Sequence, residues 1–367
     1  MSIESHELAQ LLRQTLPGAL SDERRNLEII IDTIERDGIT ACSDSEHSIF
    51  LQNAIEQHRP ILIPKRADYF SEAEIYGVDV PVVNAVPLVD EGRRQIVVFD
   101  GILQIIRFYA DLMWVLNLLM SKRSDRTFVL DEQSIPEANA FSMAAFSILA
   151  DFVNTRRTLI ALSDILGPNA RHHALFGYAG AVAFVLAHES GHLALGHTGF
   201  KNTALFERNA GLAIKEDIGR FQQLEFDADA YALESIREEI RPIFVSNALI
   251  FLGPTAFLEA FGRQRGGSHP LATNRAFHLL SLIAYDPDTA TQVKGIIESQ
   301  VLGFKQLESL RQENGGDIRH RIHERMPIEV AHEVVRMINE RVKYEIGLLD
   351  IELNGADCKD VGNVRTL

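Results

Sequence analysis

The sequence predicts a mainly α-helical protein with one small β-sheet, an α+β fold, and three observations lead to this prediction. Segments of helical length with amphipathic or continuous apolar patterns fill most of the 367 residues. A group of short segments rich in valine and isoleucine, broken by proline and glycine, follows the first three of these helical segments. An apolar content of 46% excludes general disorder and provides for a large core.

The N-terminal third is expected to hold three amphipathic helices and the small sheet. Each helix begins near a serine or aspartate, residues that cap helix N-termini, and the three cover Ile3–Thr15, Asp22–Asp37 and Ser45–Gln57. The predicted strands are Pro60–Pro64, Val78–Val89 and Gln95–Phe99. We expect this sheet to lie above the helix predicted over Asn169–His197 and to accept an extended peptide along its edge.

Longer helices are expected in the middle of the chain. Gly101–Lys122 is mostly apolar and contains Arg107 and Asp111, whose i, i+4 spacing predicts a buried helix with one ion pair. Pro136–Leu166 is predicted to be a helix that packs antiparallel to the helix after it. Pro242–Leu258 contains two prolines, which predicts a kinked core helix or a pair of helices.

The most informative helix is predicted over Asn169–His197, between the helix breaker Gly167-Pro168 and a stop at Gly199. Residues 172–188 contain no Asp, Glu, Lys or Arg, so this helix is expected to be buried nearly all round. A buried helix holds the side chains at its end rigidly.

The end of this helix carries the motif H-E-x-x-H. Residues four apart lie about 40° apart around an α-helix, so His188 and His192 present their imidazoles on one face. Glu189 lies about 100° round, at the flank of that face, where its carboxylate could take a proton from a water on a metal ion. The motif predicts a zinc hydrolase, and the alternative is a metal-free helix with two buried histidines.

A catalytic zinc usually has three protein ligands and one open position, so a third ligand is required. His197 follows His188 by nine residues, which places it about 180° round a continuous helix, facing away. The metzincin pattern would need a histidine where this chain has Thr198. We therefore interpret His197 as structural.

A better candidate lies in Leu224–Leu233, a segment with helical spacing of its apolar residues. Glu225 and Asp229 are i and i+4, so both carboxylates share one face. In a gluzincin-type site the glutamate would bind zinc, and an acid one turn later could accept the free N–H of a ligand histidine. The alternative is an acidic, solvated helix face.

A third segment, Ser268-His269-Pro270 followed by Arg275, opens another predicted helix. Together the three segments resemble the zinc metallopeptidases that include the CAAX prenyl proteases, the HtpX-like membrane proteases and their soluble relatives. The family pattern is H-E-x-G-H-x-x-x-x-H, then E-x-[ED]-A-D, then [ST]-H-P with an arginine six residues after that histidine. All three appear in this order within 170–285, under a third of the chain.

The resemblance implies a zincin-like core of the gluzincin type and assigns a role to each matching residue. The Zn²⁺ ligands would be His188, His192 and Glu225, the general base Glu189, and the partner of a ligand histidine Asp229. It further implies that His269 and Arg275 approach the metal from the substrate side and stabilise an oxyanion. Arg275 could equally pair with one of the carboxylates of the site.

The chain departs from the membrane-bound members of that family. The residues between His192 and Glu225 include seven charged side chains, among them Lys201 and Glu207, which excludes a membrane span there. The net charge of −15 argues against nucleic acid or an anionic membrane as a partner. The first 20 residues lack a signal-peptide pattern, and only two cysteines, Cys42 and Cys358, occur, so we expect a cytoplasmic protein.

We therefore predict two regions: residues 1–135, helical with the small β patch, and residues 136–367, a zincin-like metallopeptidase domain. Beyond Tyr285 the chain is expected to be helical, with surface histidines at His320, His323 and His332. The predicted function is a zinc-dependent metalloendopeptidase that hydrolyses protein or peptide substrates. The alternative is a zinc-binding regulatory or interaction protein whose site is closed by His197 or His269.

Overall fold

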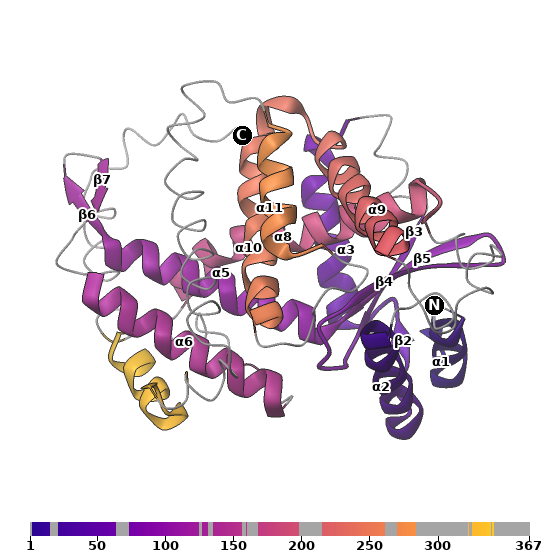
Figure 1. The fold of residues 1–367 in the computed structure, drawn as a ribbon, viewed down its shortest axis with the longest axis horizontal. Helices are drawn as coiled ribbons and strands as arrows, with labels where there is room; N and C mark the ends of the chain where they lie inside the picture. The colour runs from indigo at the N-terminus through magenta and orange to yellow at the C-terminus, as the bar shows by residue number, and fades with distance from the viewer. Residues whose placement is uncertain are drawn as a thin grey trace.

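The computed structural model describes residues 2–14, 21–63, 73–124, 127–130, 135–155, 159, 168–197, 215–260, 270–283, 322, 325–338 and 340. These residues are mainly helical with small sheets, which confirms the predicted fold class (Figure 1). The helices are α1 (Ser5–Arg13), α2 (Ser21–Asp37), α3 (Glu46–His58), α5 (Asp100–Met120), α6 (Ile135–Thr155), α8 (Pro168–Ala194), α9 (Lys215–Glu234), α10 (Arg241–Ala260) and α11 (Ala272–Ser281). None of the helices in this part of the chain is long and apolar enough to cross a membrane.

A mixed three-stranded sheet has the order β3-β5-β4, with β3 (Ala73–Val78) parallel and β4 (Ala85–Asp90) antiparallel to β5 (Arg93–Phe99). The hairpin between β4 and β5 turns at Glu91 and Gly92, with φ of 47° and 83°. Positive φ at both loop positions gives the twist that a two-residue hairpin requires. Two-stranded ladders also join β1 (Ser2–Ile3) to β2 (Ala41–Cys42) and β6 (Ser121–Ser124) to β7 (Thr127–Leu130).

The three-stranded sheet separates two hydrophobic cores, because successive side chains of a strand point to opposite faces. Ile75 and Ile96 belong to the larger core, which also contains residues of α3, α5, α8 and α10. Tyr76 and Phe99 belong to a smaller core with α1 and α2. The sheet thus carries one helical layer on each face.

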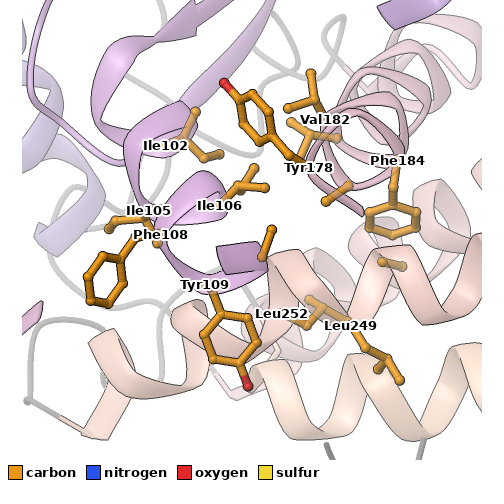
Figure 2. Packing of buried hydrophobic residues seen from close by; sticks show 14 of the residues in the cluster. Ile102, Ile105, Ile106, Phe108, Tyr109, Tyr178, Val182, Phe184, Leu249 and Leu252 are labelled. Carbon is orange, nitrogen blue, oxygen red and sulfur yellow. The ribbon is translucent and has the colours of Figure 1, made fainter. Parts of the chain in front are cut away.

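Helix α8 lies at the centre of the larger core, in contact with α3, α5, α9 and α10 and with strand β4 (Figure 1). Tyr178 and Phe184 of α8 extend toward α5 and α10, which contribute isoleucines and leucines to the packing (Figure 2). A Cβ at Gly180 would lie 2.1 Å from Nδ2 of Asn247 on α10, so a larger residue here would force the Asn247 side chain to move.

Two predicted strands differ from the structure. The prediction for Pro60–Pro64 is wrong over most of its length, because Arg59–Ile61 forms a 3₁₀ turn that continues α3, and only Leu62 makes an isolated bridge, to Ile236. The prediction for Val78–Val89 joins the end of β3 to β4, which are separate strands with a connection between them. Strand β3 itself was not predicted over most of its length, since its glutamate and glycine obscure the strand pattern.

The helix predicted to run to Leu166 is shorter. Helix α6 ends at Thr155 and Leu159 is not helical, whereas residues 156–158 and 160–166 lie outside the described residues. Within the described part of the chain, α6 packs mainly against α5 and not as the antiparallel neighbour of α8. The backbone N–H of Leu159 donates to the side-chain oxygen of Gln104 instead, at 2.7 Å. Helix α10 is one helix that contains Pro254.

The C-terminal part of the chain is described over a short helical stretch, residues 328–338, where His332 is exposed as expected. His320 and His323 lie outside the described residues. The division at residue 135 stays a prediction, and α3 and α5, which precede it, share a core with α8.

Candidate metal centre

The motif H-E-x-x-H occupies the last turns of α8, and its two histidines face each other. Their Nε2 atoms are 3.1 Å apart, and the rings meet edge to face with centroids 4.7 Å apart. Phe184, one turn earlier, stacks against the ring of His188 with centroids 6.3 Å apart. This buried packing restricts the rotation of the His188 ring.

Helix α9 supplies a carboxylate to the same point. Oε2 of Glu225 lies 3.3 Å from Nε2 of His188, and Oε1 lies 3.4 Å from Nε2 of His192. The donor atoms of these three residues all lie within 4.8 Å of one another, so the cluster could hold a metal ion. Two imidazole nitrogens and one carboxylate oxygen match the donor set of a catalytic zinc site.

Gly191 allows α9 to approach α8 at this point. A Cβ at position 191 would lie 3.1 Å from the carbonyl oxygen of Ala228 and 3.2 Å from its Cα. These are backbone atoms, so α9 itself would have to move to make room. The glycine between the two histidines therefore sets how close Glu225 comes to them.

A buried ion pair lies behind His188. Oδ1 of Asp229 is 2.9 Å from Nδ1 of His188, and Asp229 is fully buried. Arg275 of α11 donates to both oxygens of Asp229, from Nε at 2.8 Å and from Nη2 at 2.6 Å. Its Nη1 also lies 3.8 Å from Glu225. Burial alone would raise the pKa of Asp229, but the charge and hydrogen bonds of Arg275 hold that pKa below its ordinary value.

The surroundings of His188 favour its protonated form when no metal is bound. Burial and the charge of Arg275 lower the pKa of His188, but hydrogen bonds to Asp229 and Glu225 outweigh them and raise it to about 9. A metal ion needs the unprotonated nitrogen, so its binding must displace a proton from this residue.

His197 does not face away from the site, and the prediction that it does is wrong. Helix α8 ends at Ala194, and Gly196 adopts a φ of 72°, so the chain turns back. Nδ1 of His197 lies 2.9 Å from Nδ1 of His192. Burial and the charge of His192 lower the pKa of His197 to about 4. A glycine just before His197 was the signal in the sequence that could have indicated this turn.

The remaining predicted residues are placed as follows. Glu189 is buried beside His188, and its charge acts on Arg275. The guanidinium of Arg275 is turned toward Asp229, which is the pairing weighed as an alternative from the sequence, and an oxyanion-stabilising role for it stays a prediction. His269 lies outside the described residues.

The fold and the cluster define a mainly α-helical protein with a buried His-His-Glu site that could hold a metal ion. Residues 168–294, about a third of the chain, match the family model of peptidase U49. The matched segment contains the three clustered residues together with Glu189, Asp229 and Arg275. This similarity supports a peptidase. No curated protein and no solved structure matches the chain.

Proposed function

We propose that the protein is a zinc-dependent metalloendopeptidase, a gluzincin related to the HtpX-like and CAAX prenyl proteases. The observation that carries the proposal is the convergence of His188, His192 and Glu225 within 4.8 Å, inside the segment that is similar to peptidase U49. These three residues would hold the ion. The similarity in sequence and the donor set support the same class of enzyme.

Zinc bound there would polarise the scissile carbonyl and lower the pKa of a water to about 7. Glu189 is the base that takes the proton of the attacking water and passes it to the leaving amine. It adjoins His188 in the chain, and the residue is 8% exposed, so it is largely shielded from bulk water. Asp229 and Arg275 contact the other side of the ring, which would keep His188 oriented with Nε2 toward the cluster that holds the ion.

The position of His197 favours a site that this residue does not close. Within the described part of the chain, three residues form the metal-binding group. His197 contacts His192 through Nδ1, on the side of the ring away from the Nε2 pair, so it does not supply a fourth ligand in this arrangement. An open fourth position is what a catalytic zinc requires and a structural zinc lacks.

Protein or peptide substrates would lie along strand β4, one of the two end strands of the three-stranded sheet. This strand contacts α8 and pairs along one edge with β5. An extended peptide added beside β4 would form hydrogen bonds through its backbone, and backbone hydrogen bonds depend little on the sequence of the peptide. The proposal includes a cytoplasmic location, to which a chain with two cysteines is suited.

The test compares the unaltered protein with Glu189→Gln. Metal content is measured by elemental analysis, and cleavage is measured by mass spectrometry on peptides from a digested cell proteome. We expect about one zinc per chain in both proteins and new termini only with the unaltered one. Hydrolysis by Glu189→Gln at the rate of the unaltered protein would refute the assignment of the base. Absence of bound zinc, or a fourth protein ligand in X-ray absorption, would refute the catalytic metal site.

A further inference from the structure

His188 and His192 differ in the kind of group that their Nδ1 atom contacts. Nδ1 of His188 faces the carboxylate of Asp229 at 2.9 Å, whereas Nδ1 of His192 faces Nδ1 of His197 at the same distance. The Nε2 atoms of both ligand rings point into the cluster. Each ring therefore has one nitrogen for the ion and one for a polar partner.

The end of α8 brings His197 to this position. On a continuous helix, five residues correspond to about 500°, so position 197 would lie about 140° away from His192. Leu195 N still donates to the carbonyl oxygen of Gly191 at 2.9 Å, as in a helix, but Gly196 N donates to the carbonyl oxygen of Leu193 at 3.4 Å and its φ of 72° reverses the chain. The ring of His197 then packs on that of His192, with centroids 5.1 Å apart and planes at 65°.

A hydrogen bond between two Nδ1 atoms requires that one carries a proton and the other does not. A neutral histidine that binds a metal through Nε2 has its proton on Nδ1. His192 is then the donor, and His197 is a neutral acceptor with its own proton on Nε2.

We propose that His197 is a positioning residue, which fixes the tautomer and the ring orientation of His192; this inference rests on the proposed function. Its chemistry differs from that of Asp229. Asp229 brings a negative charge, which Arg275 offsets, whereas His197 orients its ligand without adding charge. The site thereby keeps both imidazoles oriented with a single carboxylate, Glu225, among the ligands.

The experiment measures the Zn²⁺ affinity of the full chain by competition with a coloured chelator, and records the visible absorption of the Co²⁺ form. His197→Leu removes the acceptor, and His197→Asn places an amide oxygen near the position of Nδ1. His332→Leu, on the exposed face of residues 328–338, is the matched control. We expect the leucine variant to lose about 10- to 100-fold in affinity with a changed Co²⁺ spectrum, and the asparagine variant to recover most of that loss.

Unchanged affinity in His197→Leu would overturn the inference, and so would equal losses in the leucine and asparagine variants. If His197→Leu does not fold, His197→Gln replaces it, because the glutamine amide reaches the place of Nε2 rather than Nδ1. Glutamine should then lose affinity where asparagine does not. If the unaltered protein binds neither ion, the proposed function fails along with the inference. Binding that is insensitive to position 197 overturns only the inference.

Discussion

Replacement of Arg275 by methionine is expected to destabilise the metal-free protein by about 3–5 kcal/mol. The guanidinium side chain is 6% exposed and donates to both oxygens of Asp229, which is 0% exposed. Methionine fills a similar volume but removes the guanidinium that donates to both oxygens of the buried carboxylate, which leaves it with His188 as its remaining positive neighbour. Since whole domains are stable by about 5–15 kcal/mol, this single loss would be a large share of the total.

The assay is urea unfolding followed by circular dichroism, at neutral pH with a chelator present. The double variant Arg275→Met/Asp229→Leu should cost less than the sum of the two single variants, because it removes both charges. Arg336→Met is the control, since it breaks an exposed pair with Glu333 at 2.5 Å and should leave the free energy of unfolding unchanged within error. Equal stability of Arg275→Met and Arg336→Met would refute the reasoning.

Further expectations concern protons and packing. The pKa of His188 is raised from its ordinary value of 6.5 to about 9. Between these two pH values, zinc binding should release about one proton from this residue, which calorimetry in buffers of different ionisation enthalpy measures. Zinc binding without proton release would contradict this expectation. Because that pKa is raised in the folded state, the metal-free protein should keep the full contribution of His188 below pH 6.5 and lose it as the pH rises through about 9, which thermal unfolding across this range can check. Gly180→Ala should lower the free energy of unfolding by about 1–3 kcal/mol, because the new Cβ would meet Asn247 at 2.1 Å. Gly219→Ala on α9 should raise it by about 0.5–1 kcal/mol, because a Cβ there has no neighbouring atom within 4 Å and alanine favours a helix. Urea unfolding of the two variants compares them, and a change of the same sign in both would count against this account of packing.

Local periodicity predicted the helices well. The expected helix over Asn169–His197 corresponds to α8 at Pro168–Ala194, and the segment Leu224–Leu233 lies within α9. These patterns depend on neighbours within a few residues, which a sequence displays directly. The spacing of Glu225 and Asp229 placed both carboxylates on one face for the same reason.

The sequence could not show which groups meet across helices. Asp229 contacts Nδ1 of His188, and Arg275 pairs with Asp229. Both contacts depend on how α8, α9 and α11 pack. The prediction for His197 failed because the helix ends at Ala194, before Gly196, rather than continuing to His197. A difference of one helical turn moved that side chain from the far side of the helix onto His192.

The sheet between the two cores also determines which parts of the chain can be altered independently. Helices α1 and α2 pack on the face of the sheet that carries Tyr76 and Phe99, whereas α8 belongs to the core on the other face. Since alternate residues of one strand serve different cores, a redesign of the N-terminal layer has to preserve only one set of strand side chains. Fusions, insertions or a new interaction surface could therefore be built on α1 and α2 without repacking the helix that carries His188 and His192.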